Sequence, residues 1–178
     1  MRGFFAVGVE GGSKVGNLGN LMRSAHGFGA SFVFTVAGEH FTKGQKFSDP
    51  SETPKQVPLY QFKTSEDLML PRLCSLVGVE LIDAAVDLPS FCHPKQAAYV
   101  LGPERGSLSE GMLARCDHVV KIPTQFALNV ATAGAIVMYD RVRVLGRWAA
   151  RPVSPFSEPD ALPAHHFGKH VSRRETRR

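Results

Sequence analysis

The chain has 178 residues, a length that suits one domain, and 43% of them are hydrophobic while 21% are charged. This composition supplies a real core and excludes a disordered, collagen-like or coiled-coil protein, and no apolar run approaches the roughly 18 residues of a membrane-spanning helix. The net charge of +5 is uneven, because residues 146–178 hold seven basic and three acidic residues. Such a basic tail attracts polyanions such as nucleic acid, but a solvated terminus without a partner has the same composition.

The first third of the chain predicts two strands around one helix. Residues 4–9 are a short apolar run that Glu10 interrupts, which is typical of a buried strand and not of a signal peptide. Asn17 is a favourable N-cap for a helix over 17–27, and we expect Arg23 to lie on nearly the same face as Asn17. Residues 31–36 predict the second strand, and the polar stretch that follows it, as far as residue 56, predicts a long loop.

The rest of the chain predicts further alternation of strands and helices. The predicted strands are 57–62, 78–83, 97–101 and 118–122, and the predicted helices are a short one starting at Thr64, 109–115 capped by Ser109, and 128–145 with Asn129 near its start. This order indicates an α/β fold with a mostly parallel sheet flanked by helices. The sequence therefore predicts one domain over 1–148, followed by a basic, Pro-containing tail over 149–178 that is extended or disordered.

Several familiar sites do not fit the sequence. The early glycines fit neither a dinucleotide-binding G-x-G-x-x-G nor a P-loop, and no serine-hydrolase elbow exists. The clustered histidines of the tail, His165, His166 and His170, lack a fourth ligand, so we expect no metal site. Cys116 lies on an amphipathic turn and is expected to pack in the core. The odd count of three cysteines argues against a disulfide framework and favours a reducing cytoplasm.

Three polar segments lie where parallel strands end, which is where such sheets bind ligands. They are Asn17–Arg23, the run Leu101-Gly102-Pro103-Glu104-Arg105-Gly106-Ser107-Leu108-Ser109, and the run Lys121-Ile122-Pro123-Thr124-Gln125-Phe126-Ala127-Leu128-Asn129. Taken singly, each is also compatible with an ordinary strand-to-helix connection.

Together, in this order and spacing, the three segments resemble the SpoU/TrmH group of the SPOUT RNA methyltransferases, over about residues 4–145. The family motifs are N-x-G-x-x-x-R, G-x-E-x-x-G-l-s and I-P-(loop)-S-L-N-v. The matching residues are Asn17, Gly19 and Arg23; Gly102, Glu104, Leu108 and Ser109; and Ile122, Pro123, Leu128 and Asn129. The sequence departs from the family at Ser107, where glycine is usual, and at Ala127, where serine is usual.

The resemblance implies a fold, a cofactor and a reaction. It implies a C-terminal trefoil knot, an exception to the general absence of knots. It also implies S-adenosylmethionine (AdoMet) bound in the knotted loops, a homodimer paired through helix 128–145, and methylation of a ribose 2′-hydroxyl in tRNA or rRNA.

The resemblance also implies roles for particular residues. Arg23 would hold an RNA phosphate and stabilise charge on the attacking oxygen, assisted by Asn17 and Asn129. Glu104 would accept bonds from backbone N–H groups of the turn, or align Arg23. The AdoMet pocket would be lined by Gly102, Ile122, Ala127, Leu128 and, at the preceding strand end, Ala84.

Two other functions remain open at this stage. A protein that keeps the fold can bind RNA without catalysis, and a SPOUT enzyme can methylate a base nitrogen instead of a ribose. Retained AdoMet binding together with RNA methylation separates the first from an enzyme, and the identity of the methylated nucleoside separates the second.

Overall fold

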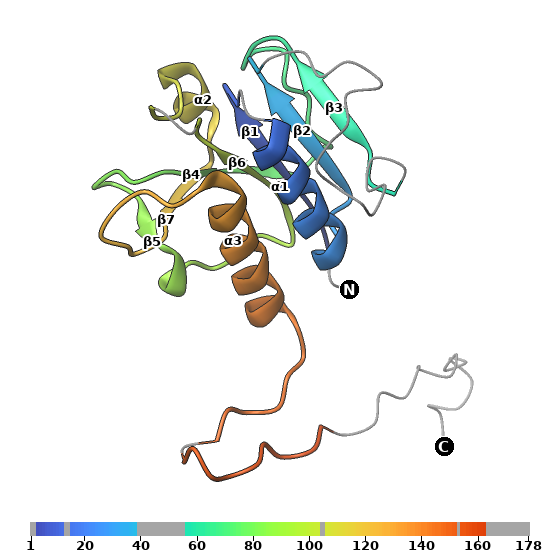
Figure 1. Cartoon of the computed structure of the whole chain (residues 1–178), viewed down its shortest axis with the longest axis vertical. Coiled ribbons are helices and arrows are strands. Elements are labelled where there is room, and N and C mark those ends of the chain that lie inside the picture. The colour runs from blue at the N-terminus through green and yellow to red at the C-terminus, as the bar shows by residue number, and fades with distance from the viewer. Residues whose placement is uncertain (1–2, 13–14, 39–55, 104–105, 153, 163–178) are drawn as a thin grey trace, which may run out of the picture. The chain divides into compact units, whose positions relative to one another are not determined.

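The computed structural model describes residues 3–12, 15–38, 56–103, 106–152 and 154–162 (Figure 1). The chain divides into two units, Met1–Gly146 and Arg147–Arg178. All the helices and strands found in the described residues belong to the first unit. In the second unit, the described residues contain only a turn over 154–157.

Seven parallel strands form one sheet. They are β1 (Phe4–Glu10), β2 (Phe32–Val36), β3 (Leu59–Phe62), β4 (Ser75–Val79), β5 (Val86–Asp87), β6 (Gln96–Leu101) and β7 (His118–Lys121). Their order is β3-β2-β1-β6-β4-β7-β5, and every neighbouring pair is parallel. β6 thus lies between β1 and β4, so the loops that leave these three strands emerge side by side at one edge of the sheet.

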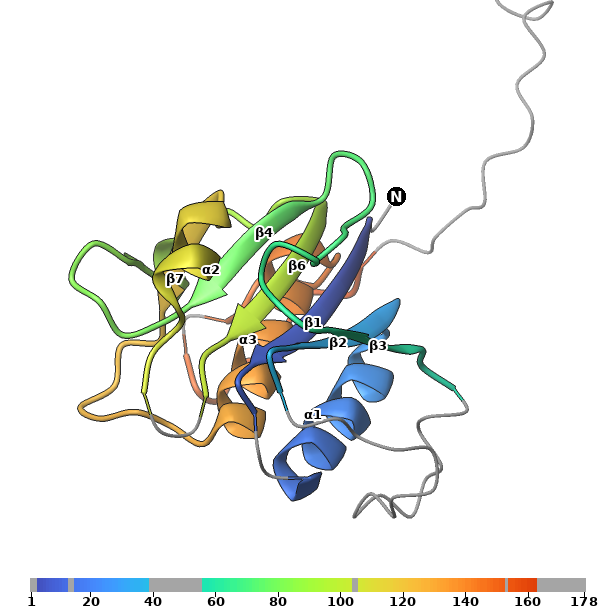
Figure 2. The ribbon, with the colours of Figure 1, turned by 90° about the horizontal axis from the view of Figure 1, so that it is seen from above.

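The helices cover both faces of this sheet (Figure 2). α1 (Val15–Phe28) and α3 (Val130–Leu145) lie together on one face, and the short α2 (Glu110–Arg115) lies on the other. A 3-10 turn, η2 (Leu88–Ser90), follows β5. None of the described helices is long and apolar enough to span a membrane.

The period-two pattern of the strands sorts their side chains between the two faces. On β1, Val7 and Val9 face α1 and α3, whereas Ala6 belongs to the cluster under α2. α3 approaches α1 closely at Gly134, where a Cβ atom would lie 2.4 Å from Leu21 Cδ1. Any larger residue at this position would force the buried Leu21 side chain to shift.

The caps predicted from the sequence are largely confirmed, but three elements differ. Ser109 and Asn129 do cap α2 and α3. Asn17 is not a cap, because α1 begins two residues before it. The helix predicted from Thr64 is wrong: the carboxylate of Asp67 accepts bonds from Thr64 N and Oγ1, and this turn stops before Pro71. The strand predicted over 78–83 is also wrong in its bounds, since β4 ends four residues earlier.

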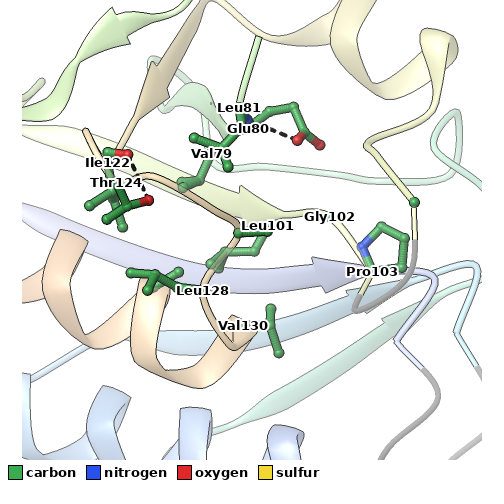
Figure 3. A pocket seen from close by; sticks show the side chains of 13 residues that line it. Val79, Glu80, Leu81, Leu101, Gly102, Pro103, Ile122, Thr124, Leu128 and Val130 are labelled. Carbon is green, nitrogen blue, oxygen red and sulfur yellow. Dashed lines mark hydrogen bonds between the residues drawn. The ribbon is translucent and has the colours of Figure 1, made fainter.

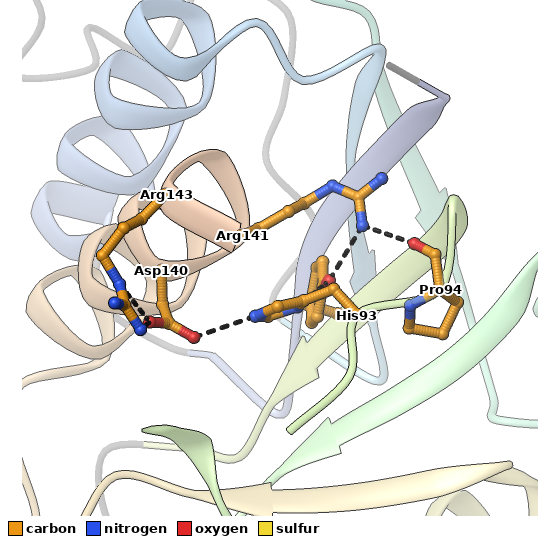
Figure 4. Close-up of polar contacts among 6 residues, drawn as sticks. His93, Pro94, Asp140, Arg141 and Arg143 are labelled. Atoms are coloured by element: carbon orange, nitrogen blue, oxygen red, sulfur yellow. Dashed lines mark hydrogen bonds and ion pairs between the residues drawn. The ribbon is translucent and has the colours of Figure 1, made fainter. Parts of the chain in front are cut away.

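A buried polar network anchors the C-terminal half of α3 to the start of β6 (Figure 4). The His93 ring lies 2.7 Å from Tyr99 Oη through Nδ1 and 3.0 Å from Asp140 Oδ2 through Nε2. Arg141 donates to Tyr99 Oη and to the carbonyls of Phe4, Pro94 and Lys95, while Arg143 donates to Asp140. These bonds satisfy charges that would otherwise be costly to bury.

Candidate active site

A pocket of about 210 Å³ lies at the carboxyl ends of β4, β6 and β7, at the end of the sheet opposite the polar network (Figure 3). Carboxyl ends of parallel strands are the usual ligand site of such sheets. Three loops and the start of α3 line the pocket: Val79, Glu80 and Leu81; Leu101, Gly102, Pro103 and Gly106; Ile122, Thr124, Ala127 and Leu128; and Val130 and Ala133.

The walls combine apolar side chains with a loop that is held in shape. Leu101, Ile122 and Leu128 present apolar surface from three directions (Figure 3). Thr124 Oγ1 lies 3.3 Å from the carbonyl of Ile122 and 2.9 Å from that of Phe126, so it closes the loop on itself. The Phe126 side chain, next to the lining residue Ala127, is 72% exposed.

Four of the five residues predicted to bind a cofactor line this pocket: Gly102, Ile122, Ala127 and Leu128. Ala84 is not among the lining residues and lies in an exposed turn. The apolar pattern continues beyond Val79, so the strand predicted from the sequence ends later than β4 does. Because β4 ends at Val79, Glu80 and Leu81 take the place expected of Ala84.

Asn17 and Asn129 join the first and third motifs. Asn129 Nδ2 donates to Asn17 Oδ1 at 3.0 Å. The Oδ1 atom of Asn129 accepts from Ala131 N and Thr132 N, so the same side chain caps α3. The pair therefore fixes the starts of α1 and α3 relative to each other, beside the pocket residue Leu128.

Arg23 lies apart from this pair. Six residues of α-helix correspond to about 600° of rotation, so the directions of Arg23 and Asn17 around α1 differ by about 120°. The expectation that they share a face is wrong. Arg23 is exposed, and it lies about 12 Å along the helix axis from the first residue of α1. Within one chain, the arginine is thus displaced from the sheet edge that carries the pocket.

Glu104 lies outside the described residues, and two other carboxylates hold the described part of its turn. Leu108 N donates to Glu80 Oε2 at 2.8 Å, and Ser109 N donates to Glu10 Oε2 at 2.8 Å. Neither glutamate is predicted from the sequence to belong to the site. Glu10 was noticed only as the end of an apolar run, and Glu80 was placed inside a strand.

The described residues show where potential metal ligands and thiols lie. They contain no group of three His, Cys, Asp or Glu residues placed to hold a metal ion, and the tail histidines lie outside them. Burial raises the pKa of the Cys116 thiol to about 11, so it stays protonated at neutral pH. Its Sγ atom lies 3.3 Å from the Met112 carbonyl, in agreement with a packing role.

Comparisons with known proteins match the same part of the chain. The model of the SpoU rRNA Methylase family matches residues 5–139. The tRNA (guanosine(18)-2′-O)-methyltransferase TARBP1 of Mus musculus is 28% identical over 144 residues, which cover 75% of this chain and 9% of that protein.

Solved structures share the fold. The SpoU methyltransferase AviRb from Streptomyces viridochromogenes superimposes with a TM-score of 0.70 at 22% identity, covering 80% of this chain and 60% of that one. The same enzyme in complex with AdoMet gives a TM-score of 0.67 at 22% identity, over 80% and 61% of the two chains. An RNA 2′-O ribose methyltransferase gives 0.68 at 26% identity, over 80% and 57%. The chain thus spans about three fifths of these structures and about a tenth of the curated relative.

Proposed function

The chain belongs to the SpoU rRNA methylase family, and from this premise we propose that it uses AdoMet to methylate a ribose 2′-hydroxyl of tRNA or rRNA. The observation that carries the proposal is the pocket at the ends of β4, β6 and β7, which is lined by motif residues Gly102, Ile122 and Leu128. The mouse relative's name, which specifies a 2′-O-methylated guanosine in tRNA, supports ribose as the target.

The pocket has the chemistry that AdoMet requires. Leu101, Ile122 and Leu128 offer apolar surfaces to the faces of a flat heterocycle. The loop over 122–128 brings backbone N–H and C=O groups to the wall, where they can bond the edges of an adenine. Such backbone recognition does not need the serine hydroxyl that Ala127 lacks. Bound AdoMet would supply the methyl group from its sulfonium: the S–CH3 bond would break, S-adenosylhomocysteine would leave, and the ribose hydroxyl would release its proton to solvent.

Arg23 is proposed to position and activate the ribose. A guanidinium stays charged at any working pH, so it suits electrostatic stabilisation better than proton abstraction. Its planar fork can bind an RNA phosphate through two bonds and lie against the oxygen on which negative charge develops. Asn17 and Asn129 hold the neighbouring helix ends in place through their mutual hydrogen bond.

The displacement of Arg23 from the pocket of its own chain supports a site built from two subunits. α1 and α3 lie side by side on one face of the sheet, so a pairing of two chains through this face can bring Arg23 of one subunit to the pocket of the other. On the outward side of α3, Ala135 and Val142 flank the exposed Tyr139 at helical spacing. We therefore propose a homodimer that pairs through α3.

Three further proposals complete the assignment. β4 lies between β6 and β7 in the sheet, and the loops that follow these three strands meet at one pocket. This arrangement supports the trefoil knot. The exposed ring of Phe126 and the basic tail offer RNA a stacking surface and positive charge. The three cysteines are free, which supports a reducing compartment such as the cytoplasm.

Calorimetric titration with AdoMet tests the pocket. Ala133 lines it, so Ala133→Leu adds a branched side chain to a space of about 210 Å³. We expect the dissociation constant to rise at least about tenfold while the circular dichroism spectrum stays unchanged. Ala114→Leu, an equal change on the exposed surface of α2, is the control and should bind as the wild type does. Wild-type affinity in Ala133→Leu would contradict the assignment of the pocket.

A further inference from the structure

The turn that follows β6 is held from both sides by carboxylates of the flanking strands. β6 lies between β1 and β4 in the sheet. Glu10 is the last residue of β1, and Glu80 directly follows β4. Their side chains bond to two successive residues of the turn, Leu108 and Ser109, and we call this arrangement the carboxylate clamp.

Glu80 joins two walls of the pocket. Its Oε1 accepts from Leu81 N at 2.9 Å, and its Oε2 accepts from Leu108 N at 2.8 Å. Glu80 and Leu81 line the pocket just after β4, and Leu108 belongs to the turn after β6, whose Gly102, Pro103 and Gly106 also line it. Leu108 is 4% exposed, so its N–H group has little access to water if the carboxylate is removed.

Glu10 holds the next residue with a bidentate contact. Its Oε2 accepts from Ser109 N at 2.8 Å, and its Oε1 accepts from Ser109 Oγ at 2.6 Å. The hydroxyl of Ser109 in turn accepts from Met112 N and caps α2. Glu10 is only 6% exposed, so these donors provide the solvation that its charge requires. The end of β1 is thereby tied to the turn that carries the second motif.

Gly102 leaves the space that the clamp occupies. A Cβ atom there would lie 3.0 Å from Glu80 Oε2 and 3.2 Å from Leu108 N. A side chain at this position would therefore crowd both partners of the clamp bond between Glu80 and Leu108. These contacts explain why a glycine stands at position 102, which the sequence alone does not explain.

We propose that Glu80 and Glu10 are positioning residues for the cofactor, which act by fixing the turn that forms one wall of the pocket. The proposal rests on the proposed function, because it takes AdoMet as the ligand of that pocket. Neither carboxylate needs to touch AdoMet. Each bonds to backbone or to Ser109, and the pocket keeps its shape because the two flanking strands restrain the turn together.

The test compares AdoMet dissociation constants with amide hydrogen exchange at Leu108, at a temperature where every variant is folded. Glu80→Ala is expected to raise the dissociation constant at least about tenfold and to speed exchange at Leu108. Glu80→Gln keeps one acceptor oxygen and should recover part of the affinity. Glu110→Ala removes an exposed carboxylate of α2 just beyond the turn and should change neither quantity.

Gly102→Ala supplies an independent check. Alone, it should weaken AdoMet binding; in the Glu80→Ala background the further loss should be smaller, because the contact with the carboxylate is gone and the 3.2 Å contact with Leu108 N remains. Fully additive losses would overturn the link between Gly102 and Glu80.

Two outcomes separate the clamp from the function it rests on. If Glu80→Ala lowers the melting temperature but leaves the AdoMet affinity of the folded protein unchanged, the positioning role is overturned. A wild type that binds no AdoMet would overturn the proposed function, and with it the role in cofactor binding. The exchange rate at Leu108 would still show whether the carboxylates hold the turn.

Discussion

Arg23 combines an exposed side chain with the central chemical role in the proposed reaction. An exposed arginine outside the core is expected to change stability by no more than about 0.5 kcal/mol when it is replaced. A group that stabilises the transition state behaves differently. Arg23→Ala should lower the turnover rate by on the order of a hundredfold or more, with melting temperature and AdoMet affinity near the wild-type values. Single-turnover methyl transfer to RNA measures this.

Two further substitutions sharpen the result for Arg23. Arg23→Lys should recover little activity, since an ammonium lacks the planar fork. Arg72→Ala removes an exposed arginine near the amino end of β4, away from the pocket, and should leave turnover unchanged. Normal methyl transfer by Arg23→Ala would mean that another group activates the ribose.

At the scale of residues, the sequence predicts positions at the pocket where a local motif marks them. Gly102 and Ile122 directly follow strand ends that the apolar runs reveal, Leu128 precedes the cap residue Asn129, and all three line the pocket. The clamp residues could not be found in this way. Glu10 and Ser109 are 99 positions apart, and Glu80 and Leu108 are 28 apart, so only the strand order brings them together.

At the scale of elements, α3 is anchored by a network whose proton positions follow from its partners. A carboxylate can only accept, so His93 Nε2 carries a proton toward Asp140, whereas Nδ1 and Tyr99 Oη lie 2.7 Å apart and either atom can donate. The environment of His93 favours the neutral ring. Burial lowers its pKa, against the opposing effect of the bond to Asp140, and the nearby charges of Arg141 and Arg143 lower it further.

This shift predicts a loss of stability in acid. The unfolded chain takes up a proton at His93 near the usual pKa of about 6.5, whereas the folded chain does so only at lower pH. The folded state is therefore favoured above about pH 6.5 and loses this contribution as the pH falls toward the lowered value. In thermal unfolding at a series of pH values, His93→Gln should flatten the decline below pH 6.5. His26→Gln, on the exposed surface of α1, should retain it, and equal slopes for His93→Gln and wild type would contradict the prediction.

The outward side of α3 yields a second prediction at this scale. Most of the apolar residues of the helix are used in the core of its own chain, as Val137 and Met138 are. Tyr139 is instead 56% exposed. We expect Tyr139→Arg to convert the proposed dimer to a monomer in sedimentation velocity at micromolar concentration. Met69→Arg, on a residue 79% exposed and remote from α3 in sequence, should remain dimeric. A wild type that sediments only as a monomer of about 19 kDa would contradict the pairing.

The elements themselves were predictable where local signals mark their ends. Ser109 and Asn129 predict the starts of α2 and α3 because their side chains accept from the first free N–H groups. The end of β4 was not predictable, since Leu81 and Ile82 continue the apolar pattern and only pairing with β6 and β7 shows where the ladder stops. Thr64 also carries a helix-start signal, but the turn that begins there ends before Pro71 and is too short to form a helix.

For the whole molecule, the uneven charge predicts a part for the tail in RNA binding. Deleting 149–178 removes six basic and three acidic residues. Affinity for RNA should fall, and the slope of log Kd against log salt should become smaller, because fewer counterions are released. Fluorescence anisotropy at several salt concentrations measures both quantities. AdoMet binding should be unchanged, since the lining residues of the pocket all precede the tail. Equal RNA affinity at every salt concentration would show that the tail is only a solvated terminus.

The central claim is transfer of a methyl group from AdoMet to a ribose oxygen, and the position of the transferred label tests it most directly. The full chain is incubated with methyl-labelled AdoMet and with tRNA and rRNA from cells that lack its gene, and the RNA is then hydrolysed in alkali. A 2′-O-methyl group blocks cleavage at its own phosphodiester, so we predict label in alkali-resistant dinucleotides, and none when Arg23→Ala replaces the wild type. Label found only in base-methylated mononucleotides would assign the enzyme to base methylation. A protein that binds RNA and AdoMet yet transfers no label to either RNA would contradict the catalytic account.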